Sequence, residues 1–404
     1  MIFLQPLERT AIWLSQKLFA GLILIAITGC NPSPDDGRLT NIPAPSGNGA
    51  SLPRLTTAID GAAWLSWVEP LEAQHTYALF FSVLGKSGWG APKRVVSGDS
   101  WFINWADFPS VVPMGDERIA AHWLSKKPGG VYAYDVAMTI SADGGRTWAD
   151  PLTPHTDGTA TEHGFVTLFP LGEDIGAVWL DGRNMTAAAR PTENGDHAHG
   201  GMTLRYGRLN LDGKLVEEAL LDELTCDCCQ TGVTVANSTP IVVYRDRTES
   251  EIRDIYVTAY RDGAWSTPYA VADDQWEIAA CPVNGPAVDS HGDQVAATWF
   301  TAAGDSPSVK VAFSFDGARS FGPAIEVDAG RVLGRVDLVM RGDGSAIVSW
   351  FAMADGELAD LRYRTVTSRG ELGPVRIVTR VSGARPTGFP QMTAAVDRLI
   401  FAWT

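Results

Sequence analysis

Four cysteines have the most distinctive spacing of any reactive side chains in the sequence. Three form the run CDCC (Cys226, Cys228 and Cys229), and the fourth is Cys281. Thiolates are nucleophiles and soft metal ligands, and in exported proteins they commonly pair as disulfides. The even number favours two disulfides, one within the run and one from the run to Cys281. Two alternatives stay open: a Cu or Zn site, to which His163 could contribute, and free redox-active thiols.

A second group of side chains could recognise a saccharide or a small acidic ligand. Arg pairs bidentately with carboxylates, and two suitably separated carboxyl groups suffice for glycoside hydrolysis. The predicted ligand-binding residues are Arg183, Arg245, Arg253, Arg335, Trp105 and His163, and the candidate catalytic residues are Asp181, Asp246 and Glu277. The same segments contain Asp107 and Glu162. Pairs such as Arg183 with Asp181 could instead tie neighbouring segments together.

All these residues fall between short strands of a repeated unit. An apolar strand with an aromatic residue at its end recurs 51 to 65 residues apart, at Trp67, Trp123, Trp179, Tyr244, Trp299, Trp350 and Trp403. Four strands per unit, separated by Gly-rich turns, predict an all-β β-propeller over residues 51–404. The loops that join strand four to strand one, and strand two to strand three, share one face of such a fold. We therefore expect the reactive residues to gather on that face.

The number of blades is predicted as six or seven. Seven repeats can be counted, but the last stops at Thr404 after its second strand. Residues near 39–45 could complete a seventh blade, which we favour, or the last two strands could supplement a six-bladed ring.

A turn motif recurs between the third and fourth strands of these units. The segment SADGGRTW contains Ser141, Asp143, Gly145 and Trp148, and a weaker copy contains Ser314, Asp316 and Phe321. An Asp can accept hydrogen bonds from backbone N–H groups of its own turn, and Gly permits a left-handed conformation. These motifs are interpreted as structural, because their Asp and Gly residues serve to form the turn.

The turns and the repeat length resemble the Asp-box (bacterial neuraminidase repeat) propellers of the sialidase superfamily. The resemblance implies a six-bladed fold and an exo-α-sialidase-like site with three Arg residues, a Tyr nucleophile paired with a Glu, and an Asp acid/base. The Arg of the family's Phe/Tyr-Arg-Ile-Pro motif has no counterpart, because the segment Ser51–Leu55 reads SLPRL. No Tyr–Glu pair can be assigned. We therefore favour a protein that binds a glycan or another acidic ligand, with a rearranged glycoside hydrolase or a metal- or redox-handling propeller as alternatives.

The N-terminus reads as a lipoprotein export signal. Positive charge at Arg9 and Lys17 precedes a short apolar run that ends in Ile27-Thr28-Gly29-Cys30. This pattern predicts a signal peptide at residues 1–29, lipidation of Cys30, and a Pro-, Gly- and Ser-rich tether over residues 30–50. Asn31 favours the outer membrane, with the lipid as the only bilayer contact.

The net charge argues against one class of partner. The formal charge of −15 at pH 7 disfavours non-specific binding to nucleic acid. We expect a monomer.

Overall fold

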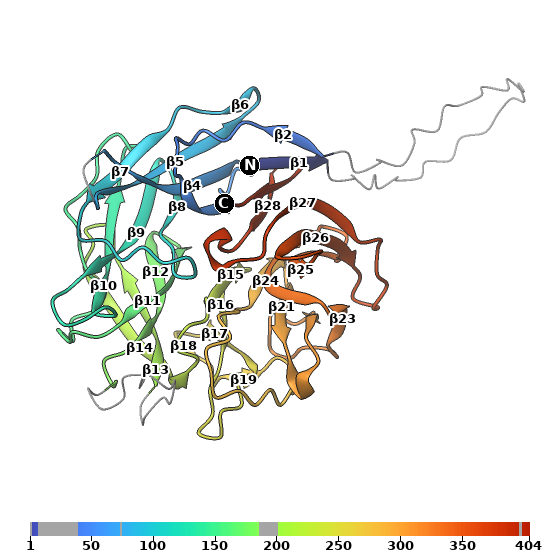
Figure 1. Cartoon of the computed structure of the whole chain (residues 1–404). Helices are drawn as coiled ribbons and strands as arrows, with labels where there is room; N and C mark the ends of the chain where they lie inside the picture. The colour runs from blue at the N-terminus through green and yellow to red at the C-terminus, as the bar shows by residue number, and fades with distance from the viewer. Residues whose placement is uncertain (1, 7–38, 73–74, 186–200, 396–397) are drawn as a thin grey trace, which may run out of the picture.

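A computed structural model describes residues 2–6, 39–72, 75–185, 201–395 and 398–404. Within this part of the chain, the strands form seven antiparallel sheets arranged around a ring, and the two ends of the chain lie close together (Figure 1). The predicted all-β propeller is confirmed.

Six of the sheets follow one another between residues 51 and 382. The first consists of β3 (Ser51–Thr57), β4 (Ala63–Pro70), β5 (Tyr77–Gly85), β6 (Gly88–Trp89) and β7 (Lys93–Gly98), and the second of β8 (Ser110–Gly115), β9 (Arg118–Lys126) and β10 (Tyr134–Ser141). The third consists of β11 (His163–Leu171), β12 (Asp174–Asp181), β13 (Met202–Leu209) and β14 (Leu215–Thr225), and the fourth of β15 (Gly232–Ala236), β16 (Thr239–Arg245), β17 (Ile255–Arg261), β18 (Ala264–Trp265) and β19 (Tyr269–Ala270). The fifth consists of β20 (Ala287–His291), β21 (Gln294–Thr301), β22 (Ser308–Ser314) and β23 (Ile325–Ala329), and the sixth of β24 (Val332–Met340), β25 (Ala346–Met353), β26 (Leu358–Val366) and β27 (Arg376–Ser382). Two short 3₁₀ helices, η2 (Ala303–Asp305) and η3 (Arg385–Thr387), lie in connecting loops.

The seventh sheet joins the two ends of the chain. The hairpin of β28 (Gln391–Ala395) and β29 (Arg398–Ala402) pairs with β1 (Ile2–Pro6), and β1 pairs with β2 (Thr40–Ile42). Residues of the hairpin pack against the sixth sheet on one side and the first sheet on the other. The region near residues 39–45 thus contributes to this sheet, as expected, but β1 from the predicted signal peptide is the direct neighbour of β29.

The strand-end aromatic residues form the layers between the sheets. All seven are at least nine-tenths buried, from 0% exposed at Trp179, Trp299 and Trp350 to 7% at Trp403. Each buried indole N–H needs an acceptor, and four find a carboxylate: Glu69 for Trp67, Asp181 for Trp179, Asp274 for Trp299 and Asp328 for Trp350, at 2.6–2.9 Å. Removing so much aromatic surface from water is the main force that joins one sheet to the next.

The two turn motifs make matching hydrogen bonds. Asp143 Oδ1 accepts from the backbone N–H groups of Arg146 and Thr147 at 2.9 Å, and Asp316 Oδ1 accepts from Arg319 and Ser320 in the same way. Trp148 meets Phe81 of the first sheet edge-on, so this turn links the second sheet to the first. The expected fourth strand after it is reduced to a single bridge between Met138 and Leu152.

Within the described ranges, no helix has the length and apolar character needed to cross a bilayer.

Candidate functional site

A cavity of about 750 Å³ opens among the loops on one face of the propeller. Besides Phe165 of β11, its lining comes from loops that lead from one sheet to the next and from loops that join second to third strands: Asn104–Ala106, Gly129–Ala133, Ala160–Glu162, Met185, Asp227, Cys228, Cys281, Val283 and Arg385. These are the two kinds of loop that the sequence analysis placed on one face. The volume falls in the range of small-molecule sites.

Three titratable side chains form a chain of contacts beside this cavity. Tyr134 Oη lies 2.6 Å from Glu162 Oε1 and 3.1 Å from Asp107 Oδ2. Tyr134 is fully buried at the start of β10, where its ring stacks on Phe102 with centroids 4.1 Å apart. Asp107 is also buried, whereas Glu162 reaches the cavity wall. Glu162 is therefore the member of the chain that a bound molecule can touch.

Burial of the two carboxyl groups favours their protonated forms. Burial raises the pKa of Glu162 to about 8 and the pKa of Asp107 to about 7, against the opposing hydrogen bond from Tyr134. The charges of Asp107, Asp227 and Cys281 reinforce the shift at Glu162. The Tyr134 hydroxyl has one proton and can donate to only one of its two neighbours. If both contacts are hydrogen bonds, one carboxyl group must be protonated and donate to the Tyr134 oxygen.

The backbone around Asp107 is shaped for this contact. Asp107 Oδ1 accepts from the backbone N–H of Phe165 at 2.8 Å, and Phe165 has a φ of 52°, which bulky residues seldom adopt. A Cβ atom at Gly164 would lie 2.0 Å from Asp107 Oδ2. Only glycine therefore leaves room for the carboxylate at this point.

Of the residues predicted to bind a ligand, Trp105 lines the cavity. Its ring stacks on Phe389 with centroids 5.7 Å apart, and the guanidinium carbon of Arg335 lies 4.9 Å from its ring centre.

The four predicted Arg residues lie outside the cavity lining and bind other parts of the protein. Arg245 is 1% exposed and donates to the carbonyl oxygens of Asn284, Arg253 and Phe300 at 2.6–3.0 Å. Arg335 donates to the carbonyl of Gly388 at 3.0 Å, and Arg183 forms a bidentate pair with Asp181 at 2.7 and 2.8 Å. Arg253 is fully buried and pairs with Glu251 at 2.7 Å. The expected Arg-rich binding face is thus replaced by guanidinium groups that hold loops together, and Arg385 is the guanidinium in the lining.

His163 belongs to a separate buried cluster. Its ring stacks on His155 at 3.9 Å, and its Nε2 lies 3.2 Å from Asp157 Oδ2 and 3.7 Å from Asp181 Oδ1. Burial, aided by the charge of His163, lowers the pKa of His155 to about 4. The neutral form of His155 is therefore favoured at neutral pH. Asp181 is also tied to Trp179, which makes it a structural acceptor and not an accessible acid.

The other two candidate catalytic residues lie away from the cavity lining. Asp246 is buried, and burial together with Asp222 raises its pKa to about 7. Glu277 is exposed and pairs with Ile252 through an isolated bridge. Neither is brought next to Glu162.

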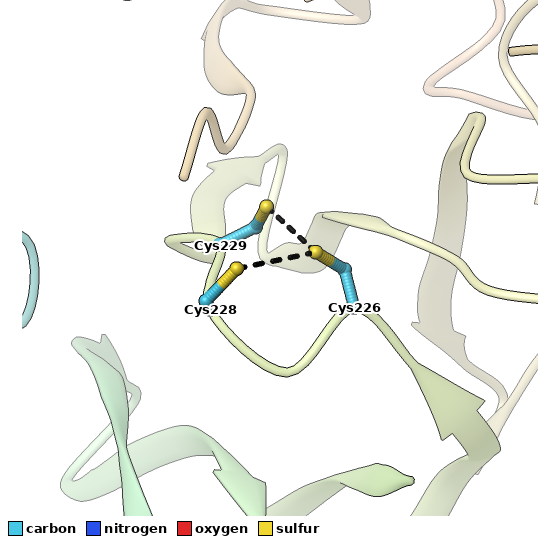
Figure 2. A group of neighbouring side chains, drawn as sticks. All are labelled: Cys226, Cys228 and Cys229. Carbon is cyan, nitrogen blue, oxygen red and sulfur yellow. Dashed lines mark hydrogen bonds between the residues drawn. The ribbon is translucent and has the colours of Figure 1, made fainter. Parts of the chain in front are cut away.

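The cysteines converge but are not bonded to one another. Among the described residues, Cys226, Cys228, Cys229 and Cys281 are all free, so the structure does not contain the predicted disulfides. Cys226 Sγ lies 2.8 Å from Cys229 Sγ and 3.9 Å from Cys228 Sγ (Figure 2). Burial opposes ionisation, but the Cys228 and Cys229 thiols and the nearby Arg253 and Arg245 charges lower the pKa of Cys226 well below its usual value. Cys30 lies outside the described residues.

The structure brings a different carboxylate, Glu162, to the cavity wall than the three that the sequence analysis favoured. Glu162 and Asp107 were noted there, but nothing in their spacing distinguishes them from Asp181 or Asp246. Tyr134 was missed because it lies inside an apolar strand, where a Tyr reads as core. The one local signal was the glycine after His163, whose missing Cβ admits Asp107.

Comparisons with known proteins give only distant structural likenesses. No protein-family model and no curated protein matches the chain. Solved structures with a similar fold include a Hadza microbial sialidase, 12% identical with a TM-score of 0.43, where the match covers 74% of this chain and 63% of that one. A Trypanosoma rangeli sialidase is 12% identical with a TM-score of 0.47, and the match covers 79% of this chain and 56% of that one. A Penicillium chrysogenum α-L-arabinanase is 12% identical with a TM-score of 0.43, and the match covers 82% of this chain and 93% of that one. The chain spans less than two thirds of the two sialidases. All three TM-scores are below 0.5, and a fold by itself assigns no activity.

Proposed function

We propose that this protein binds a saccharide in the cavity formed by the propeller loops. The observation that carries the proposal is a cavity of about 750 Å³ whose wall combines the aromatic rings of Trp105 and Tyr132 with Glu162 and Arg385. Aromatic faces cover the apolar faces of sugar rings, and a few convergent polar groups fix orientation. Because Glu162 and Asp227 line the same wall, a neutral sugar or one with a single acidic group at Arg385 fits better than a polyanion.

A comparison of two exposed aromatic residues tests this proposal. Tyr132 and Phe315 are 57% and 58% exposed, but of the two only Tyr132 lines the cavity. For the oligosaccharide identified by array binding, Tyr132→Ala should weaken affinity at least about tenfold by calorimetry, because an anchoring ring is lost. Phe315→Ala should bind as the wild type does. Equal affinities in both variants would place binding elsewhere.

A second candidate function is glycoside hydrolysis. The proton held between Asp107, Tyr134 and Glu162 favours it, since Glu162 could donate that proton to the oxygen of a leaving sugar. Asp227, the other carboxylate of the lining, would then stabilise positive charge at the sugar or activate a water molecule. Its carboxylate is held at 3.1 Å by Arg247 and at 3.0 Å by the N–H of Met202.

We also propose that the propeller is exported and anchored by lipid on Cys30, in the outer membrane. The support is the Ile27–Cys30 pattern after an apolar run. Processing would remove β1, the strand between β2 and β29, from the seventh sheet. Labelled palmitate should enter the wild-type protein and not Cys30→Ser, and label in both proteins would refute anchoring at this residue.

A further inference from the structure

Three thiols converge in a single loop that neighbouring sheets hold in place. The Sγ atoms of Cys226, Cys228 and Cys229 all lie within 4.8 Å of one another, and Figure 2 shows the three side chains directed toward one another. The loop begins directly after β14, where the N–H of Cys226 donates to the carbonyl of Arg245. At its other end the Gln230 side chain donates to the carbonyl of Ala106 at 2.6 Å and accepts from the N–H of Gly285 at 3.1 Å. The loop is thus fixed by contacts to other sheets and does not depend on a bond between its sulfur atoms.

The group borders the cavity. Cys228 and Cys281 line the cavity, and Cys281 is exposed. Cys226 and Cys229 lie behind them, 0% and 2% exposed. A solute could therefore enter through the cavity, meet Cys228 and Cys281 first, and end among buried sulfur atoms.

The donor atoms of the group are all sulfur. Asp227 lies between two of the cysteines in sequence, but its carboxylate binds Arg247 and the N–H of Met202. The fully buried Arg253 points its Nη1 at Cys226 Sγ from 3.5 Å, which supplies positive charge beside the sulfur atoms.

We propose that Cys226, Cys228 and Cys229 form a binding site for one soft d¹⁰ metal ion, Cu(I) or Zn(II), with Cys281 able to complete it from the cavity side. Thiolate ligands select these ions over Mg²⁺, Ca²⁺ and Mn²⁺. Three sulfur atoms suit Cu(I), whereas four would provide the tetrahedral set that Zn(II) prefers. Cys228 and Cys281 also belong to the wall of the saccharide cavity, but metal binding by the sulfur atoms does not require a saccharide.

Metal titration of the full chain tests the proposal without any saccharide, so its outcome is independent of the proposed function. Every protein carries Cys30→Ser, so that Cys30 contributes no thiol, and is purified anaerobically with reductant. The reduced protein is titrated with Cu(I) against a chromogenic chelator and, separately, with Zn(II). We expect about one ion per chain, sulfur-to-metal absorption for Cu(I), and protection of the thiols from alkylation.

Variants identify the ligands. Cys228→Ser, at a half-buried position, should reduce affinity by more than the roughly 10–100-fold that loss of an outer-shell partner costs. Cys281→Ser should retain Cu(I) if three sulfurs bind the metal and lose Zn(II) if four do. Thermal unfolding of each variant shows whether it is folded. Three results would each overturn the proposal. The folded, reduced protein could bind neither ion, or a folded Cys228→Ser variant could bind as tightly as the wild type. Alternatively, the cysteines could be disulfide-bonded in protein isolated under exclusion of air.

Discussion

Arg245→Ala should unfold far more readily than the wild-type protein, with a loss of roughly 3–5 kcal/mol in the free energy of unfolding. The guanidinium group joins three segments, since it donates to the carbonyls of Arg253, Asn284 and Phe300. It also stacks over Trp276, with its central carbon 4.8 Å from the ring centre. Truncation would leave an empty space and up to three buried carbonyl groups without this donor. Urea denaturation followed by Trp fluorescence measures the loss.

Two further variants separate burial from charge in this prediction. Arg245→Lys keeps a cation that can reach some of the carbonyls but loses the planar fork, so its stability should fall between those of Ala and the wild type. Arg146→Ala removes a side chain that is 69% exposed and should unfold much as the wild type does. A stable Arg245→Ala protein that has lost saccharide affinity would instead show that Arg245 acts in binding, as the sequence first suggested.

Glu162→Gln should cause the largest loss of activity if the protein hydrolyses a glycoside. Gln keeps the hydrogen bond with Tyr134 but cannot deliver a proton, and general acid catalysis contributes about 10²–10⁴-fold to such reactions. We expect kcat to fall by that factor with little change in KM. Glu277→Gln is the matched control, because the sequence favoured Glu277 and the structure leaves it exposed outside the cavity. Loss of activity in Glu277→Gln alone would reverse the assignment.

The same residue predicts a pH dependence with a defined direction. Activity that needs protonated Glu162 should decline as pH rises through about 8, and the decline should be absent from any residual activity of Glu162→Gln. The pKa of Glu162 is higher in the folded protein than its ordinary value of 4.5, so between these values the folded state binds more protons than the unfolded state. The free energy of unfolding should therefore decrease as pH rises through that window. Glu162→Gln should flatten this slope, and an unchanged slope would mean that the carboxyl group ionises normally.

The sequence by itself determined the class of fold and the face on which a site could form. Aromatic strand ends that recur 51 to 65 residues apart predict a propeller, because each such strand must bury its ring against the next sheet. All seven rings are buried, and the cavity is lined by the two kinds of loop that the repeat assigned to one face.

Only the tertiary structure decided which residues of that face meet. Asp107, Tyr134 and Glu162 come from three separate segments, and their contact depends on how two sheets twist past each other, which strand periodicity does not encode. The roles of the Arg residues depend on burial: the same guanidinium binds a ligand when it faces solvent and ties loops together when carbonyl oxygens surround it, as at Arg245. The cysteine run was visible in the sequence, but whether its sulfur atoms converge was a question of loop geometry, and they do.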